Sequence, residues 1–538
     1  MHARPPMRRR LPAVLLVLLL VALGACTDDG ADATAATSTT IPRPSTVVRI
    51  GVEDWPACVN PLTCRDDALH EQVLQHVLPV AFEIDATGAY VASAMLAERP
   101  ILEVGEDGAS IRYVIDPDAR WADGRPITSS DFVGTWQAVM STPGTDRLRW
   151  EDIVDVDDSD PTVAVVTLAR PIVDWQELFG GASGYVLQAD SFGPSTDLTG
   201  QFEDELPMAA GPYLLSSWDE NGAVLSATEP WPGAEPPGID QVRLDRVQID
   251  SLGDPMTFDM LVPGADSTAQ APAGFDVRRT ATTRVLGLWF DQREPSLQPL
   301  EQRQAFERLL DRSELAGLAG VGDVVTCAGW VPDLGPWCST ASVEPAEVDT
   351  DVAQYTLAAL GWTRGGFGVL FRGDELLTVP ITYDPALRGG EDVASAVSEA
   401  LGAIGVETRL AETSTSTWAD PARSLDASTG LGVFAVDLGT SPRVDQLYGC
   451  PGGPESSVVA ACPDDITGPA RSLAAQTPEE ALSAVEALGT TVDASVLWLP
   501  LRVVPERSFV RPGRVVTAPA SNAVGGPLAG LHRFDADV

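Results

Sequence analysis

One stretch of the chain, Trp121-Ala-Asp-Gly-Arg-Pro-Ile-Thr-Ser-Ser-Asp131, carries the most informative local pattern in the sequence. It follows Ile111–Ile115, where apolar and polar residues alternate as they do in a half-buried strand. Near its end, Thr128 is followed three residues later by Asp131, which is the spacing of a capping box with Asp in place of the preferred Glu. The next residues, 132–140, carry apolar side chains on one helical stripe. The stretch therefore predicts a strand, a tight turn and a capped amphipathic helix.

This succession resembles the signature of the extracytoplasmic solute-binding proteins of family 5, which are the peptide-, nickel- and oligosaccharide-binding components of ABC importers. The family usually shows a strand, then Trp-Ser-Asp-Gly-x-Pro-Leu-Thr-Ala-x-Asp-Val, then an aromatic-rich helix; here Ala122 replaces the Ser. Other segments match the family in its own order: Val48–Val52, Val59–Pro61, Met95–Glu98, Ala210–Tyr213, Leu286–Phe290, Arg303–Ala305, Val352–Gly361 and Arg511–Val515. The resemblance spans roughly residues 47–535, but Asp254–Gln270 gives no clear match.

The resemblance implies an α/β fold of the type II periplasmic-binding-protein class, with two lobes around a ligand cleft plus one extra domain. Lobe I would take residues 47–80, 187–282 and 500–538. The extra domain would take residues 81–186 and carry the Trp121 signature, and lobe II would take residues 283–499. This discontinuous division comes from the family, since no sequence pattern could show it.

Periodicity adds several local expectations to this fold. Helices are expected over Leu300–Leu315 and Glu391–Ile404. Another is expected to begin at Thr477, where Thr, Pro and Glu occupy the positions of a capped first turn. A strand is expected over Val496–Val504, where Pro500 indicates an edge position or a bulge.

The N-terminal residues are typical of an export signal. Residues 1–25 contain four arginines followed by an apolar run from Leu11. The run is shorter than the ~20 apolar residues that a transmembrane helix needs. It ends in Leu23-Gly-Ala-Cys26, which resembles a bacterial lipobox, so Cys26 is the expected lipid attachment site. Residues 26–46 would then form a flexible tether; a plain secretory peptide with an incidental Cys is the alternative.

The charge of the chain argues against nucleic acid as a partner. The sequence has 35 Lys and Arg against 77 Asp and Glu, for a formal net charge of −42. Loss of the four arginines in residues 1–25 would bring the net charge to −46. Such a chain repels a phosphate backbone, and we interpret the acidity as a property of the solvated surface.

The cysteines fit an exported chain. Apart from Cys26 there are six, which fall into three pairs that are close in sequence: Cys58 and Cys64, Cys327 and Cys338, and Cys450 and Cys462. An even number in an exported protein favours disulfides, and although 15 connectivities are possible for six cysteines, the local pairs are the simplest. A zinc site is the alternative, but no CxxC spacing and no nearby His supports it.

No pattern in the sequence predicts catalysis, a metal site or a cofactor. His70-Glu71 begins like a zinc-protease motif, but the next histidine is His76, at i+6 rather than the required i+4. With so few histidines and no Gly-x-Ser-x-Gly, a serine-hydrolase triad has no support either.

The candidate ligand-binding residues come from the resemblance. Phe434-Ala-Val-Asp437 resembles the family's Trp-x-Ala-Asp, whose Asp holds the α-amino group in peptide-binding members. The resemblance therefore implies that Asp437 anchors the ligand and that Phe434 takes the aromatic position. An Asp that caps a turn at a strand end is the alternative. Trp55, Trp289 and Phe290 are further candidates, because large aromatic residues provide area at a cleft, although a core position is the alternative for each.

The resemblance implies capture of a small ligand, most simply a short peptide, and its delivery to ABC permease subunits. The chain is expected to be a monomeric lipoprotein on the outer face of the cell membrane, with no enzymatic activity. An oligosaccharide or a nickel chelate remains an alternative ligand. A sensor or scaffold lipoprotein that kept the fold and lost transport is an alternative of a different class.

Overall fold

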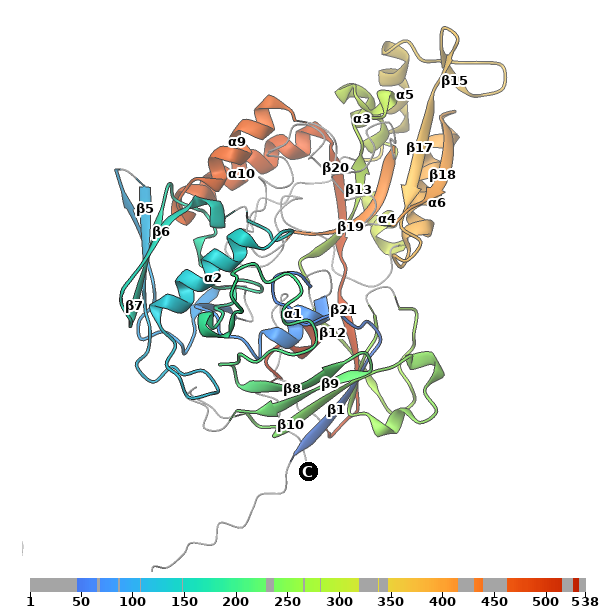
Figure 1. Cartoon of the computed structure of the whole chain (residues 1–538). Helices are drawn as coiled ribbons and strands as arrows, with labels where there is room; N and C mark the ends of the chain where they lie inside the picture. The colour runs from blue at the N-terminus through green and yellow to red at the C-terminus, as the bar shows by residue number, and fades with distance from the viewer. Residues whose placement is uncertain are drawn as a thin grey trace, which may run out of the picture. The chain divides into compact units, whose positions relative to one another are not determined.

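Most of the chain is described by a computed structural model (Figure 1). The described residues are 46–64, 68–85, 88–106, 108–147, 149–228, 237–264, 267–280, 282–318, 337, 347–414, 430–438, 462–514 and 526–531. Residues 45–538 form one compact unit. Three of its sheets organise the described part, and we call them the first, second and third sheets.

The first sheet has seven strands in the order β12-β21-β11-β1-β10-β9-β8. Its central strand β1 pairs in parallel with β10 and β11, and the remaining pairs are antiparallel. The strands come from three distant parts of the sequence: β1 (Val47–Val52), β8 (Tyr213–Asp219), β9 (Gly222–Ala227), β10 (Gln241–Arg246), β11 (Met260–Val262), β12 (Asp276–Thr280) and β21 (Glu506–Val510). Strand β11 lies in the segment 254–270, which shows no clear resemblance to the family pattern.

The second sheet has five strands in the order β18-β17-β19-β13-β20. They are β13 (Arg284–Phe290), β17 (Thr378–Tyr383), β18 (Glu407–Glu412), β19 (Leu431–Asp437) and β20 (Trp498–Val503). Strand β20 is an edge strand, and its pairing with β13 shifts register beside Pro500. Both features expected of this proline are therefore present. The expected lobe boundary at residue 500 falls inside β20, so the chain leaves the second sheet only after Val503.

The third sheet has the order β4-β5-β7-β6 and contains the strand predicted before the Trp121 signature. Its strands are β4 (Leu102–Gly105), β5 (Gly108–Val114), β6 (Ile153–Asp160) and β7 (Val163–Leu168). Helix α2 (Ser129–Ser141) packs on this sheet against β6 and β7. Two small sheets complete the described strands: β2 (Phe82–Ile84) with β3 (Tyr90–Ala92), and β14 (Thr363–Arg364) with β15 (Leu370–Arg372) and β16 (Glu375–Leu376).

The remaining helices largely follow the sequence pattern. They are α1 (Ala68–Leu74), α3 (Leu300–Glu307), α4 (Arg312–Leu318), α5 (Thr350–Ala359), α6 (Gly390–Ala403), α9 (Asp464–Ala474) and α10 (Pro478–Ser495). Thr477 caps α10 together with Glu480, as predicted. The single helix expected over 300–315 is wrong: α3 ends at Glu307, and the Asp311 carboxylate accepts the N–H groups of Ser313 and Glu314 to begin α4.

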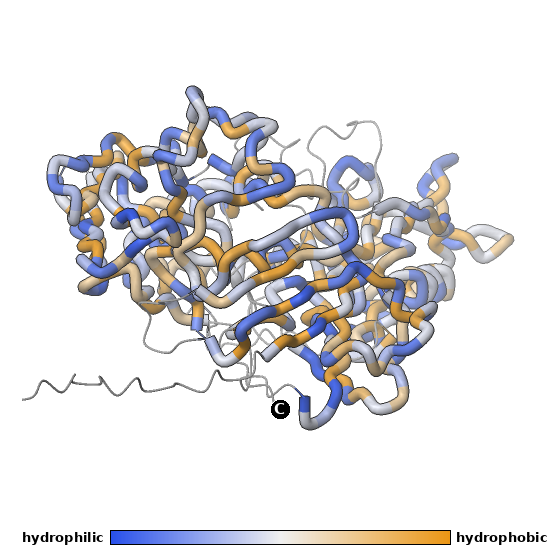
Figure 2. Tube along the Cα trace, turned by 60° about the horizontal axis from the view of Figure 1, so that its bottom comes forward, coloured by the Kyte–Doolittle hydropathy of each residue, from blue (hydrophilic) through white to orange (hydrophobic). Residues whose placement is uncertain are grey.

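The apolar core is divided between the sheets. Figure 2 shows hydrophobic stretches that alternate with hydrophilic ones along the trace. One cluster of buried side chains joins the first and third sheets through α1 and α2, and a second covers one face of the second sheet. A third cluster lies between the other face of the second sheet and the α9–α10 pair. The division into lobes stays a prediction, because the described contacts form a single compact unit.

The signature is held together by the carboxylate of Asp131. Its Oδ2 accepts the backbone N–H of Thr128 at 2.9 Å and the indole N–H of Trp121 at 3.1 Å. Its Oδ1 accepts the backbone N–H of Ala189 at 3.0 Å. Because Asp131 is only 5% exposed, these donors would lose their partner in a buried place if the carboxylate were removed.

We expect Asp131→Ala to lower the free energy of unfolding by about 2–4 kcal/mol, since it leaves buried donors unsatisfied. Asp118→Ala is the matched control, because Asp118 is an exposed carboxylate in the preceding turn. Equilibrium unfolding in urea measures both. A loss equal to that of the control would show that the Asp131 contacts do not stabilise the signature.

A second prediction concerns Asp493 on α10. Its Oδ2 is buried without a hydrogen-bond partner. Burial raises the pKa of Asp493 to about 6, and Glu307 adds to this effect while Arg312 opposes it. The folded protein thus holds this proton more tightly than the unfolded chain, in which an Asp has a pKa of about 3.9. The contribution of Asp493 to stability therefore falls as pH rises from about 4 to 6.

We expect Asp493→Asn to raise the free energy of unfolding by about 1–2 kcal/mol near pH 7.5, after allowance for partial exposure, and to have little effect near pH 4. Glu486→Gln, on the exposed face of the same helix, should be neutral at both pH values. Urea unfolding across this pH range measures the free energy of unfolding of the wild type and both variants. An Asn variant that is equally or less stable at high pH would contradict the assignment.

Candidate functional site

The chain passes between the first and second sheets at two neighbouring places. One is the link from β12 to β13, and the other is the link from β20 to β21. The hydroxyl of Thr282 donates to the carbonyl of Val504 at 2.6 Å, and the Val504 N–H donates to the carbonyl of Arg284 at 2.9 Å. We call these hydrogen-bonded links the crossing.

Asp437 lies at the crossing, at the end of β19. Its carboxylate is exposed, and Oδ1 accepts the hydroxyl of the buried Thr283 at 2.5 Å. The Leu438 N–H donates to the Thr283 carbonyl at 3.0 Å, so backbone and side chain together fix this end of β19. Asp437, the expected ligand anchor, therefore lies at the end of a strand of the second sheet rather than in a loop.

A basic residue faces Asp437 on the neighbouring strand. Arg284 is its register partner in the antiparallel pair of β13 and β19. Residues directly opposite each other in such a pair project to the same side, ~5 Å apart at Cβ. The register therefore places a basic and an acidic residue opposite each other on one side of the second sheet. Sequence reasoning missed Arg284, because only the strand register brings it opposite Asp437.

Three of the aromatic candidates are core residues in this structure. Phe434 and Phe290 are 0% exposed and Trp289 is 1% exposed. The Trp289 indole N–H donates to the Phe434 carbonyl at 3.3 Å, and its ring stacks on Trp498 at 4.4 Å between centroids. A Cβ on Gly287 would lie 2.7 Å from the Trp498 ring, so this glycine makes room for the stack. A core position, which the sequence left open for Trp289 and Phe290, accounts for all three residues, and none offers surface to a ligand here.

Trp55 lies elsewhere, beside the edge strand β8. Its ring stacks on Trp218 at 4.8 Å between centroids, and its indole N–H donates to the Asp219 carbonyl at 2.9 Å. Strand β8 is at the edge of the first sheet opposite to β12, the strand that leads into the crossing. The structure therefore does not bring Trp55 together with Asp437.

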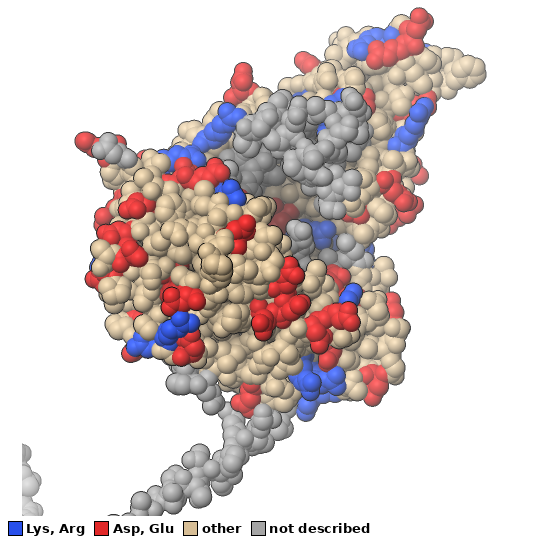
Figure 3. Space-filling view, in the orientation of Figure 1, with Lys and Arg blue, Asp and Glu red and all other residues tan. Residues whose placement is uncertain are grey.

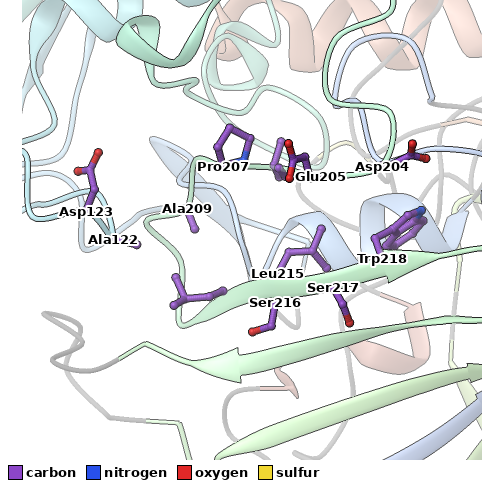
Figure 4. Close-up of a pocket in the computed structure, with 12 residues that line it drawn as sticks. Ala122, Asp123, Asp204, Glu205, Pro207, Ala209, Leu215, Ser216, Ser217 and Trp218 are labelled. Carbon is purple, nitrogen blue, oxygen red and sulfur yellow. The ribbon is translucent and has the colours of Figure 1, made fainter.

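A cavity of about 410 Å³ is lined by Trp218, one member of this tryptophan pair. Figure 4 shows residues from three segments around it: the signature turn, residues 204–209, and β8 with Trp218. Asp123 of the signature faces the cavity and is paired with Arg125 at 2.7 Å. The hydrogen bond from the Arg125 side chain, above all, lowers the pKa of Asp123. No sequence pattern marked this cavity, because it forms only where β8 meets the signature turn.

The structure shows one of the expected disulfides. Cys58 and Cys64 are joined, with 5.8 Å between their Cα atoms. Cys462 is also disulfide-bonded. Cys327, Cys338, Cys450 and Cys26 lie outside the described residues, so the other two pairs and the lipid attachment stay predictions.

The described part of the chain holds no group of three or more His, Cys, Asp and Glu side chains that could bind a metal ion. Within the same residues, no helix has both the length and the apolar character needed to cross a membrane. Acidic side chains are spread over the face seen in Figure 3 rather than gathered in one patch.

Comparison with known proteins agrees with this architecture. Residues 92–453 match the profile of the bacterial extracellular solute-binding proteins, family 5. The chain is 28% identical over 376 residues to a protein of Mycobacterium tuberculosis named "Probable monoacyl phosphatidylinositol tetramannoside-binding protein LpqW", covering 63% of this chain and 58% of that one. It is 26% identical over 374 residues to the oligopeptide-binding protein OppA of Mycobacterium bovis, covering 61% of each. The chain thus matches less than two thirds of the length of these relatives.

Solved structures share the fold at low identity. The periplasmic EDTA-binding protein EppA superposes with a TM-score of 0.78 at 16% identity, over 92% of this chain and 97% of that one. The oligopeptide-binding protein AppA of Bacillus subtilis, solved with a nonapeptide, gives a TM-score of 0.70 at 15% identity, over 92% of this chain and 100% of that one. The α/β architecture is that of the type II periplasmic-binding-protein fold, as predicted. With its profile match covering more than half of the sequence, the chain belongs to family 5 of the bacterial extracellular solute-binding proteins.

Proposed function

We propose that this solute-binding protein captures a short peptide with a free α-amino group and delivers it to the permease of an ABC importer. The carboxylate of Asp437 would hold the amine, and no catalytic step is part of the proposal. Transport is the role of the family, and we propose the peptide, its anchor and the monomeric state for this chain.

The observation that carries the proposal is the position of Asp437. Its carboxylate is exposed at the crossing, and the Thr283 hydroxyl holds one oxygen in place. A carboxylate that is already oriented loses little entropy when a cation binds. Its bond to an ammonium group is charge-assisted, which makes it stronger than a neutral hydrogen bond. Arg284, opposite Asp437, would repel a second cation and favour a ligand that also carries a carboxylate.

The relatives support a peptide without deciding the ligand. OppA is named an oligopeptide-binding protein, and the AppA structure contains a nonapeptide. The name of LpqW favours a mannose-bearing lipid as the second candidate. Such a ligand has no amine, so the two candidates differ in their need for the Asp437 charge.

We also propose that the protein is a lipoprotein anchored through Cys26 on the outer face of the cell membrane. The support is the Leu23-Gly-Ala-Cys26 ending of the apolar run and the extracellular character of the family.

Asp437→Asn should weaken binding of a free-amine peptide by roughly tenfold to a hundredfold, because a charge-assisted bond contributes ~1.5–3 kcal/mol. The same peptide with an acetylated N-terminus should bind the wild type and the variant within about a factor of three, since it carries no charge for Asp437 to hold. Titration calorimetry with both peptides measures the four affinities.

Asp374→Asn is the matched control, because Asp374 is an exposed carboxylate in the turn between β15 and β16. It should bind both peptides as the wild type does. If Asp437→Asn keeps full affinity for the free-amine peptide, Asp437 is not the anchor. A natural ligand without an amine, identified by native mass spectrometry, would move the function towards glycolipids or sugars.

Cys26→Ser should shift the protein from the membrane fraction to the medium. A lipid chain contributes ~0.8 kcal/mol per buried CH₂ to membrane binding, and the variant has no thiol to receive it. Cell fractionation followed by immunoblotting measures the distribution, with Cys58→Ser as a cysteine variant that should stay on the membrane. Retention of the Cys26 variant on the membrane through its N-terminus would contradict the lipid assignment.

A further inference from the structure

Three arginines from distant parts of the sequence lie near one another beside the crossing. Arg279 of β12 and Arg507 of β21 are register partners in an antiparallel pair. Arg388 lies in the loop between β17 and α6, and it acts on Arg507 as a neighbouring charge. Arg279 and Arg388 are exposed, and Arg507 is partly buried.

This arrangement is unfavourable for an isolated protein. Side chains that face each other directly across an antiparallel pair are ~5 Å apart at Cβ, and like charges in such a pair are destabilising. Partial burial, and then the charges of Arg388 and Arg279, lower the pKa of Arg507, against the opposing effect of Glu53. Each of these effects disfavours the charged form of Arg507, and a bound anion would relieve them.

No acidic side chain of the described residues forms an ion pair with these arginines, although the chain has 77 Asp and Glu against 35 basic residues. Glu53 is an acid whose charge acts on Arg507, but its two carboxylate oxygens accept the N–H groups of Ile249 and Gly264. In so acidic a protein, three neighbouring arginines that form no ion pair within the described residues are a distinct feature of the crossing.

The backbone holds Arg507 in a fixed orientation. Its Nη1 donates to the Ala269 carbonyl at 3.2 Å, and its Nη2 donates to the Ser267 carbonyl. The guanidinium also lies 5.9 Å from the centroid of the Phe509 ring. Neutral carbonyls orient this guanidinium without neutralising it, so its charge remains available to an oxyanion, with the exposed residues Arg279 and Arg388 as its neighbours.

We propose that Arg279, Arg388 and Arg507 form a binding site for an oxyanion, a carboxylate or a phosphate group, next to the crossing. Arg279 and Arg507 belong to the first sheet, whereas Arg388 belongs to the part of the chain that carries the second. A bound oxyanion therefore links the two sheets through its charge. The site is separate from Asp437 and does not depend on a peptide being the ligand.

Titration calorimetry of the full-length protein with inorganic phosphate tests the site, in Tris buffer with chloride added to keep the ionic strength constant. Arg279→Gln and Arg388→Gln should each bind phosphate at least tenfold more weakly than the wild type. Arg278→Gln is the matched control, since Arg278 is the next residue of the same exposed strand and projects to the other face. It should bind phosphate as the wild type does.

Thermal unfolding is a second test of the site, and it does not depend on the heat of binding. In chloride alone, Arg279→Gln should unfold at a higher temperature than the wild type, because one charge of the repelling pair is gone. In saturating phosphate the order should reverse. Arg278→Gln should show neither effect.

Titration with acetate separates the two sources of the oxyanion. Binding of both anions assigns a general carboxylate and phosphate site, and binding of phosphate alone assigns a phosphate site. Equal phosphate affinity of the wild type, Arg279→Gln and Arg388→Gln, or a phosphate effect no larger than that of chloride, would overturn the proposal. Asp437→Asn should bind phosphate normally, so failure of the peptide assignment and failure of this one are distinguishable.

Discussion

The connection between the first and second sheets depends on a small set of hydrogen bonds at the crossing. Thr282, Val504 and Arg284 tie the two links to each other, and Thr283 ties the end of β19 to the same place. In a two-lobed binding protein, a few residues at element ends absorb the backbone rotation of domain closure. Because these bonds join both links, the two passes of the chain must move together. Under the proposed function, a ligand bound by Asp437 would act at this same place, because the Asp437 carboxylate accepts the Thr283 hydroxyl there.

The sequence was most informative where a local pattern and a capping residue agreed. The signature placed β5 and α2 correctly because the Asp131 carboxylate accepts the Thr128 N–H and the Trp121 indole N–H within the signature itself, and only one distant donor, the Ala189 N–H. The start of α10 at Thr477 and the bulge beside Pro500 were also predicted correctly, because each depends on the chemistry of one residue. The expected helix over 300–315 failed because its apolar periodicity continues through a break that Asp311 creates.

The candidate site was less predictable, because aromatic residues suit a core and a cleft equally well. Trp289 and Phe434 looked like cleft residues in a motif, but strand alternation places them against α9 and α10. Nothing in a single sequence tells which face of a buried strand meets a ligand. The sequence could not point to Arg284, Arg279 and Arg507 either. Each of them is brought opposite its partner only by strand register between segments far apart in the chain. By contrast, the family's Asp could be carried onto Asp437, whose position at a strand end is compatible with both of its expected roles.

The stack of Trp289 on Trp498 gives this protein an intrinsic optical probe. The two indoles lie 4.4 Å apart on adjacent strands of the second sheet, and β20 leads directly into the crossing. Rings held this close in a rigid core couple their electronic transitions, which produces a strong near-ultraviolet circular dichroism signal. Any rearrangement that shears β20 against β13 changes the angle between the rings and hence the signal. Spectroscopy of the unlabelled chain can therefore follow motion at the crossing in real time.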